Sequence, residues 1–362
     1  MPYRDQSTPN DRAPAIDVAI IGDGVIGLST ALELGRAGAS CCVIGAHHDG
    51  AASAAAAGLL APTIGSVAEA ARPFFLGSLD HYPTFLESLR EFDPALSMLH
   101  GLIEVVSQGP ARPQSASFTR LSADDVSRLE PSLSAPFGAL LHARDGAIDN
   151  VRLIRALRGA VTSHPSIRLI VANPAEMVVA TDRGVSIRLV GGTRIEARHV
   201  VIAAGAWSPQ IRGLPRPLPV VPLKGQMLAL GAGPLSHAVM GDGAYLVPRE
   251  HEIVVGSTSE DAGFDTSTTP EAIDRLRAAA ASICPLLAAA PLVRAWAGIR
   301  PATPDMLPII GPDPEVPRLL YACGHSRNGI LLAPATARAI AALAQDKQPE
   351  WDLAAFSISR FA

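Results

Sequence analysis

The sequence predicts an α/β protein in which a parallel, nucleotide-binding layer is interleaved along the chain with a mostly antiparallel α+β domain. A buried apolar strand at residues 17–21 runs into a glycine-spaced turn and then into an amphipathic helix. Between residues 167 and 257 several short segments alternate apolar and polar side chains, as antiparallel strands do. The chain has 362 residues, too many for one small core, so two domains are expected.

Three glycines in the first turn have separate expected roles. Gly22 permits the tight turn, Gly24 lets the backbone approach a pyrophosphate, and Gly27 lets the helix pack against the strand. The phosphates then lie at the helix N-terminus, where unpaired N–H groups and the helix dipole favour negative charge. A second apolar strand at residues 40–44 completes a Rossmann-like unit.

Composition and charge exclude several classes of protein. Hydrophobic residues make up 48% of the chain and charged residues 18%, which fits a well-buried globular fold. The net charge of −4 and the scattered arginines give no footprint for nucleic acid. Apolar stretches are too short to cross a bilayer, and residues 1–15 lack the apolar core of a signal peptide, so we expect a mobile arm there and a cytoplasmic protein.

The remaining elements follow from local patterns. Ser122, followed by two aspartates and closed by Pro131, starts a helix at 122–130. Four cysteines without C-x-x-C spacing are expected to be reduced thiols, and no motif has metal-ligand spacing. We expect further helical segments at 66–92, 151–161, 270–283 and 334–343, and strands at 102–107, 167–171, 176–180, 185–190, 194–198, 200–204, 226–230, 244–248, 253–257 and 319–323.

Several motifs together resemble one known family. They are Gly22–Gly27, residues 55–62, residues 200–208, Lys224-Gly225-Gln226, residues 245–249, residues 296–301 and the long run 324–336. This set resembles the glycine oxidase branch of the D-amino-acid oxidase superfamily, which are FAD-dependent amine oxidoreductases. The resemblance covers nearly the whole chain, and the run 324–336 is its most specific part.

The resemblance implies a discontinuous division of the chain. The FAD-binding domain is expected at residues 16–85, 145–213 and 295–362. The substrate domain is expected at residues 86–144 and 214–294, and it would cover the flavin with its sheet. Proline-rich residues 214–222 are interpreted as a crossover between the two domains.

Three residues are candidates for the catalytic site. A guanidinium holds a carboxylate with two parallel hydrogen bonds, and the resemblance implies that Arg300 binds the substrate carboxylate in this way. Tyr245 is expected to donate to the same carboxylate while its ring walls the pocket. Arg327 matches a residue that lines the active site in the family, next to a helix whose N-terminus would stabilise negative charge on reduced flavin.

A larger set is expected to bind the cofactor through backbone groups and small side chains. Its members are Gly22, Gly24, Val25, Ile26, Gly27, Ala57, Gly58, Leu59, Ala204, Gly205, Trp207, Gly324, His325, Arg327, Asn328, Gly329 and Ile330. His325 serves equally well as a structural histidine, because hydride transfer requires no histidine base.

Two positions depart from the family pattern. Gly45 follows the second strand, where the family normally has a glutamate that binds ribose hydroxyls. Asp49, His47 and His48 are nearby substitutes, and weakened FAD binding is expected rather than lost binding. Ser326 stands where the family often has a larger side chain, which would change the shape of the pocket.

The resemblance implies oxidative deamination of glycine or another small amino acid or amine. Hydride transfer to flavin would give an oxo acid and ammonia, and molecular oxygen would be reduced to hydrogen peroxide. In many relatives the imine feeds thiamin thiazole synthesis, and homo-oligomers are common. Three alternatives stay open: a dehydrogenase with an acceptor other than oxygen, a sarcosine-like secondary-amine oxidase, and a non-catalytic flavoprotein subunit.

Overall fold

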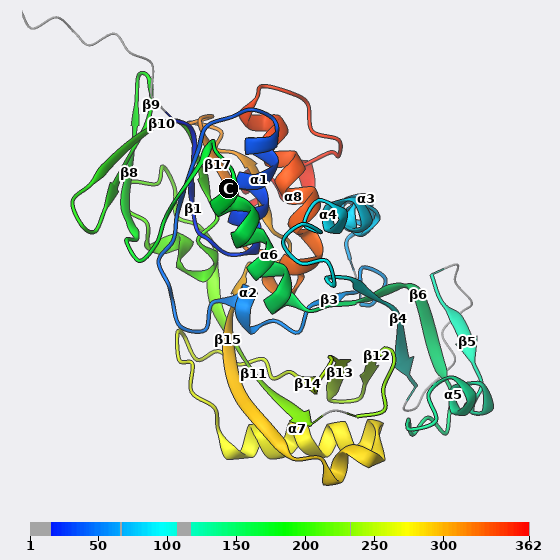
Figure 1. Cartoon of the computed structure of the whole chain (residues 1–362). Coiled ribbons are helices and arrows are strands. Elements are labelled where there is room, and N and C mark those ends of the chain that lie inside the picture. The colour runs from blue at the N-terminus through cyan, green and yellow to red at the C-terminus, as the bar shows by residue number, and fades with distance from the viewer. Residues whose placement is uncertain (1–15, 66, 107–116, 232, 362) are drawn as a thin grey trace, which may run out of the picture.

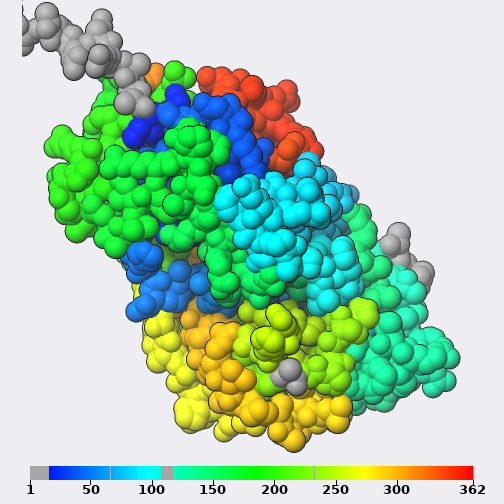
Figure 2. Space-filling view, in the orientation of Figure 1, coloured from blue at the N-terminus to red at the C-terminus, as the bar shows by residue number. Residues whose placement is uncertain are grey.

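Two β-sheets organise the molecule, and their strands alternate along the chain. The computed structural model describes residues 16–65, 67–106, 117–231 and 233–361. The expected arm at residues 1–15 lies outside the described residues. Figure 1 shows one sheet with its helices at the top of the view and the second sheet, backed by a helix, at the bottom. In Figure 2 the yellow and orange surface of the second sheet and the red C-terminal segment lie at opposite ends of the molecule.

Sheet A contains the parallel strands and the strand-turn-helix unit expected from the glycine motif. Within the described residues it has eight strands, in the order β16-β17-β10-β1-β2-β7, with β9 paired to β10 and β8 paired to β9. Ile21 is in register with Ile202 and with Ile44 of the parallel neighbours, so three carboxyl ends meet at one edge. The strands are β1 (Ile16–Ile21), β2 (Cys41–Ile44), β7 (Ile167–Ile170), β8 (Ala175–Thr181), β9 (Gly184–Leu189), β10 (Arg194–Ile202), β16 (Ile309–Pro312) and β17 (Leu319–Cys323).

Helices cover one face of sheet A, and the β8–β9 hairpin covers part of the other. The helices are α1 (Val25–Arg36), α3 (Arg72–Asp80), α4 (Tyr82–Glu87), α6 (Asn150–Ser163) and α8 (Gly329–Ala344). Side chains alternate between the two faces, so Cys41 joins the hydrophobic cluster beneath the helices and Cys42 joins the cluster beneath the hairpin. Both thiols are buried and free.

Sheet B forms the second layer and is mostly antiparallel, as expected. Its order in the described chain is β15-β11-β14-β13-β12-β4-β6-β3, with β5 beside β6 and with β4 parallel to β12. Helix α7 (Pro270–Ile283) packs on one face, and the other face turns toward sheet A. The strands are β3 (Leu59–Leu60), β4 (Met98–Val105), β5 (Thr119–Leu121), β6 (Ala139–Ile148), β11 (Val221–Gly231), β12 (Ala238–Gly241), β13 (Ala244–Pro248), β14 (Glu252–Gly256) and β15 (Leu292–Ala302).

Short elements connect the layers. Helix α5 (Ala123–Leu129) begins at the expected Ser122, whose hydroxyl accepts from the N–H of Asp125 in a capping box. The other short helix is α2 (Ala52–Ala55), and 3-10 turns occur at Glu69–Ala71, Gly205–Gln210, Pro285–Ala289, Ser326–Asn328, Ala354–Phe356 and Ile358–Phe361. No helix of the described chain is both long and apolar enough to cross a membrane.

The structure corrects several expected elements. β10 is one strand rather than two, because its first half pairs with β9 and its second half with β1. Strands β5, β6, β12, β15 and β16 were not expected, since charged residues and glycines interrupt their apolar alternation. The last helix begins at Gly329 rather than at Pro334, so that proline lies inside it.

Side chains from α3 and α4 compensate for the proline within α8. Pro334 has no N–H to donate to the carbonyl of Ile330. The Tyr82 hydroxyl donates to that carbonyl at 2.5 Å, and the Ser78 hydroxyl donates to the carbonyl of Leu331 at 2.7 Å. Burial raises the pKa of Tyr82, which keeps the phenol protonated as a donor. The helix therefore extends to Gly329, at the edge of sheet A.

We expect Tyr82→Phe to lower the free energy of unfolding by about 1–3 kcal/mol, because the buried carbonyl of Ile330 loses its donor. Denaturant unfolding of the purified protein measures this loss. Ser282→Ala is the control, since that hydroxyl is exposed and bonds only its own helix, at the carbonyl of Ala279. A loss no larger than that of the control would show that Tyr82 does not support α8.

Candidate active site

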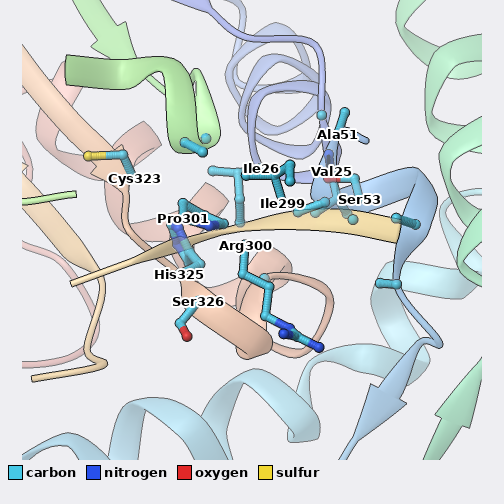
Figure 3. Close-up of a pocket in the computed structure, with 18 of the residues that line it drawn as sticks. Val25, Ile26, Ala51, Ser53, Ile299, Arg300, Pro301, Cys323, His325 and Ser326 are labelled. Carbon is cyan, nitrogen blue, oxygen red and sulfur yellow. Dashed lines mark hydrogen bonds between the residues drawn. The ribbon is translucent and has the colours of Figure 1, made fainter. Parts of the chain in front are cut away.

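A cavity of about 720 Å³ lies between sheet A and the inner face of sheet B. The carboxyl ends of β1, β2, β10 and β17 form one side, and β11, β12, β13, β15 and the segment after β14 form the other. Figure 3 shows side chains of α1, of β15 and of the segment that follows β17 around the cavity. Ligands of open α/β sheets bind at the carboxyl ends of the strands, so the position of this cavity is the one that the fold favours.

The glycine turn forms the phosphate end of the cavity. Gly22 has φ +124°, and a Cβ there would overlap the carbonyl of Ala203 on the neighbouring strand. A Cβ on Gly24 would lie 2.9 Å from the hydroxyl of Ser53, which accepts from the N–H of Val25 at 3.0 Å. The backbone is therefore open toward the cavity at the N-terminus of α1, where an anion is stabilised.

Gly27 is the one predicted cofactor residue that does not line the cavity. A Cβ there would overlap the carbonyl of Gly22, so the glycine allows α1 to pack closely behind the turn. Val25 and Ile26, its neighbours in the same helix, do line the cavity.

The loop at Ala57–Leu59 reaches the cavity from the start of β3. Gly58 has φ +85°, and its carbonyl accepts from the N–H of Ile148 at 2.9 Å. The buried Asn150 amide donates to the carbonyl of Ser53 at 2.7 Å, and the Arg249 guanidinium donates to the amide oxygen of Asn150 at 2.5 Å. These bonds tie the loop to both sheets, so its small residues are held at the cavity wall.

Small residues also follow β10. Ala204 and Gly205 line the cavity, and Gly205 has φ +56°. The Trp207 indole stacks on the imidazole of His48, with ring centroids 4.1 Å apart and planes 7° apart. Burial lowers the pKa of His48, so the ring in this stack is neutral at physiological pH.

Arg300 extends into the cavity from β15. In Figure 3 its side chain points away from Val25 and Ser53 of the phosphate end. The guanidinium donates to the hydroxyl of Ser257 at 2.5 Å and to the carbonyl of Thr258 at 3.2 Å. It is half-buried, and no carboxylate of the described residues lies within 4.0 Å of it.

Tyr245 lies beside Arg300 on β13. Its ring packs over Gly256, where a Cβ would overlap the phenol. Burial raises its pKa, while Ser257 and Arg300 act in the opposite direction. The phenol is therefore protonated at neutral pH and available as a donor toward the same region that Arg300 faces.

The turn after β17 brings the C-terminal motif to the cavity. Gly324 and Ser326 have φ +72° and +49°, which turns the chain sharply from the strand into α8. Gly329 and Ile330 line the cavity, so the N-terminus of α8 is directed at it. Arg327 is exposed at the rim, and a Cβ on Gly65 would lie 3.0 Å from its guanidinium.

His325 is buried beneath this turn. Its Nε2 lies 3.1 Å from the hydroxyl of Thr336 in α8. Burial lowers the pKa of His325 to about 3, so the imidazole is neutral across the physiological range. These contacts fit the structural role better than an acid or base role.

Apart from Gly27, every residue predicted to bind substrate or cofactor lines this one cavity. Of the motif Lys224-Gly225-Gln226, only Gly225 does so, because side chains alternate along β11. A Cβ on Gly225 would overlap the guanidinium of Arg300, so this glycine leaves the space in which the arginine lies.

Sequence reasoning missed several lining residues. Met227, Met240, Ser257 and Thr258 form the wall around Arg300 and Tyr245, and Ser53 meets the phosphate end. Their side chains are chemically ordinary and carry no motif. The available signal was the position of Ser257 as the last residue of the predicted strand 253–257, which pairs with the strand of Tyr245.

The residues present fit a flavin dinucleotide. One end of the cavity has bare backbone at a helix N-terminus, which suits a pyrophosphate, and the middle has apolar walls, which suit a ring system. The opposite end has an arginine and a tyrosine that lie beside each other. Backbone groups near Gly58, Gly324 and Gly329 would hold the ring, and Gly22 and Gly24 the phosphates.

Comparisons with known proteins agree on one family. A family model described as DAO, FAD dependent oxidoreductase, matches residues 17–343. The glycine oxidase of Pseudomonas aeruginosa is 34% identical over 357 residues, which cover 94% of this chain and 98% of the relative. The crystal structure of glycine oxidase from Geobacillus kaustophilus has a TM-score of 0.87 at 31% identity and covers 95% of this chain and 98% of its own.

Two further proteins are similar to this chain over most of its length. The bifunctional protein ThiO/ThiG of Nostoc sp. is 34% identical over 95% of this chain, but the match spans only 55% of that longer protein. The crystal structure of iminodiacetate oxidase from Chelativorans sp. has a TM-score of 0.84 at 27% identity, covering 94% of this chain and 98% of its own.

We expect His325 to make the folded state less stable as the pH falls from 6.5 toward 3. Its folded pKa is depressed, so the unfolded state takes up a proton first, at up to about 1.4 kcal/mol per pH unit. His325→Gln, which keeps a hydrogen-bonding group, should show a shallower fall between pH 6.5 and 4.5 in denaturant unfolding. Exposed His251→Gln is the control. Parallel curves for wild type and His325→Gln would contradict the assignment of a buried neutral imidazole.

Proposed function

The chain belongs to the DAO family of FAD-dependent oxidoreductases, and from this premise we propose that it oxidises glycine or another small amino acid. The mixed α/β fold and the FAD cofactor expected from the sequence are confirmed by this membership. The substrate, the electron acceptor and the roles of individual residues are the proposed part.

The observation that carries the proposal is the unpaired guanidinium of Arg300. No acid of the described residues pairs with this half-buried arginine, whose neighbours there are the hydroxyl of Ser257, the carbonyl of Thr258 and the phenol of Tyr245. The hydroxyl and the carbonyl fix the plane of the guanidinium and leave donors directed into the cavity. The missing anion is the α-carboxylate of the substrate, which a guanidinium binds with two parallel hydrogen bonds.

The neighbouring residues complete the binding of a small amino acid. Tyr245 donates from its protonated phenol to the same carboxylate, and Met227 and Met240 limit the space for a side chain. The neutral amine points to backbone carbonyls near Gly58 or Arg327. The cavity thus selects a short substrate whose carboxylate is anchored at one end.

The remaining chemistry depends on electrostatics at the cavity. FAD, held by the residues named above, would supply the two-electron acceptor for the hydride, with molecular oxygen as the final oxidant. The N-terminus of α8, at Gly329, places positive potential beside the cavity, which favours the negative charge of the reduced state. With glycine, water and oxygen as reactants, the products are glyoxylate, ammonia and hydrogen peroxide.

A second candidate is the oxidation of secondary amines that carry a carboxylate, such as sarcosine. The similarity to iminodiacetate oxidase favours it, since the name of that protein specifies a secondary amine. The same Arg300 anchor serves both substrate classes. Anaerobic addition of glycine, sarcosine, D-alanine and D-proline separates them by which compound bleaches the flavin absorbance, and peroxide release in air separates an oxidase from a dehydrogenase.

We expect Arg300→Lys to lower kcat/KM for amino acids by about 30- to 150-fold. Lysine keeps the charge but loses the planar fork, a loss of about 2–3 kcal/mol in transition-state binding. Steady-state peroxide production measures the change. Arg294→Lys is the control on the same strand, where the guanidinium faces Glu252 and the ring of Trp296 outside the cavity. Unchanged kinetics for Arg300→Lys would rule out the carboxylate anchor.

A further inference from the structure

The end of β2 lacks the acid that binds the ribose hydroxyls in a Rossmann site. In the structure, another side chain fills the space that this acid would occupy. Gly45 is buried directly after β2, where a Rossmann site usually has an acid that binds the ribose hydroxyls. A Cβ on Gly45 would lie 2.5 Å from the carboxyl carbon of Asp23. The carboxylate of Asp23, from the middle of the glycine turn, therefore fills the space that a side chain at position 45 would need.

Asp23 is held in this position by an ion pair from α6. The Arg158 guanidinium donates to its Oδ2 at 2.8 Å, and the Asp23 side chain is only 15% exposed. Its Oδ1 has no hydrogen-bond partner among the described residues, and Asp23 lines the cavity at the phosphate end. One carboxylate oxygen is thus anchored by protein and the other remains available to a ligand.

The other substitutes for the missing acid are less well placed. Asp49 is exposed and does not line the cavity. His48 stacks on Trp207 as a neutral ring, and exposed His47 carries no carboxylate that could accept from two hydroxyls.

Glu176 also lines the cavity, but both of its carboxylate oxygens accept from arginines, Arg188 and Arg212. Among the described acids of the cavity wall, Asp23 therefore has the carboxylate oxygen that is left for a ligand.

We propose that Asp23 has taken over the ribose-binding role of the missing acid, and that Gly45 is the compensating change that makes room for it. This inference rests on the proposed function, because the ligand is the adenosine ribose of FAD. The acceptor of the ribose hydroxyls has moved from the end of the second strand to the glycine turn. Residues 23 and 45 are then a coupled pair. An acid at one of these positions allows FAD binding only when the other position has a small residue.

The experiment measures nucleotide affinity rather than activity. Apoprotein is titrated with FAD, and separately with ADP and its 2′,3′-dideoxy analogue, which lacks the hydroxyls that Asp23 would accept. Wild type is expected to prefer ADP by about 10- to 100-fold, the worth of charge-assisted hydrogen bonds. In Asp23→Ala the Kd values for ADP and for the dideoxy analogue are expected to differ by no more than about threefold. The Kd for FAD should rise by about 10- to 100-fold.

Two variants separate the ribose contact from other effects. Asp49→Ala removes the exposed neighbouring acid and should leave both affinities unchanged. Arg158→Met removes the ion pair but keeps the carboxylate, so the preference for ADP should persist. If Arg158→Met lost the preference for ADP to the same extent as Asp23→Ala, the proposal that the Asp23 carboxylate binds the ribose hydroxyls would be overturned.

Moving the acid from position 23 to position 45 tests the coupling of the two residues most directly. Gly45→Glu alone should weaken FAD binding, because the new side chain meets the carboxylate of Asp23. Combining it with Asp23→Gly should restore the affinity to within about tenfold of wild type, since the acid returns to the strand end. A double variant that binds as poorly as Gly45→Glu alone would overturn the coupling. Wild-type apoprotein that binds no FAD would overturn the proposed function instead, whereas tight FAD binding unaffected by Asp23→Ala would overturn only this inference.

Discussion

A guanidinium that faces a cavity without an acid partner is the interaction on which the rest of this structure depends. Arg300 is anchored by Ser257 and Thr258, which hold its plane but do not neutralise it. A half-buried positive charge of this kind raises the energy of the empty site and lowers the energy of a site that contains a carboxylate. The space around it exists because Gly225 has no side chain. In the proposed function, this charge is what selects an anionic substrate.

The surrounding scaffold keeps the two ends of the cavity at a fixed separation. Asn150 and Arg249 connect the loop after α2 to both layers through buried hydrogen bonds. At the other side, Tyr82 and Ser78 allow α8 to continue past a proline and reach the cavity. These contacts touch neither proposed ligand, yet they place the backbone groups that do. Rigid elements of this kind are needed where a carbon atom must be held over a ring for hydride transfer.

Much of the fold could be predicted from sequence because its strongest signals are local. The strand, turn and helix around Gly22 follow from apolar periodicity and glycine spacing, and the cap at Ser122 follows from side-chain chemistry. Strand β15 was missed because its first three residues are exposed and because Arg294 and Arg300 interrupt its apolar residues. The start of α8 was missed because the donor that replaces the N–H of Pro334 comes from Tyr82, more than 200 residues away in sequence. No local pattern contains that information. The same limit applies to Asp23, whose relation to Gly45 exists only in space.

The most direct test of the central claim is a crystal structure of the FAD-bound protein with glycolate, in which a hydroxyl replaces the amine of glycine. The account predicts that the carboxylate of glycolate lies on the guanidinium of Arg300 with the Tyr245 phenol as a second donor, and that the flavin lies between this site and the turn at Gly22. Glycolate bound elsewhere in the cavity, with Arg300 still bonded only to Ser257 and Thr258, would contradict the account.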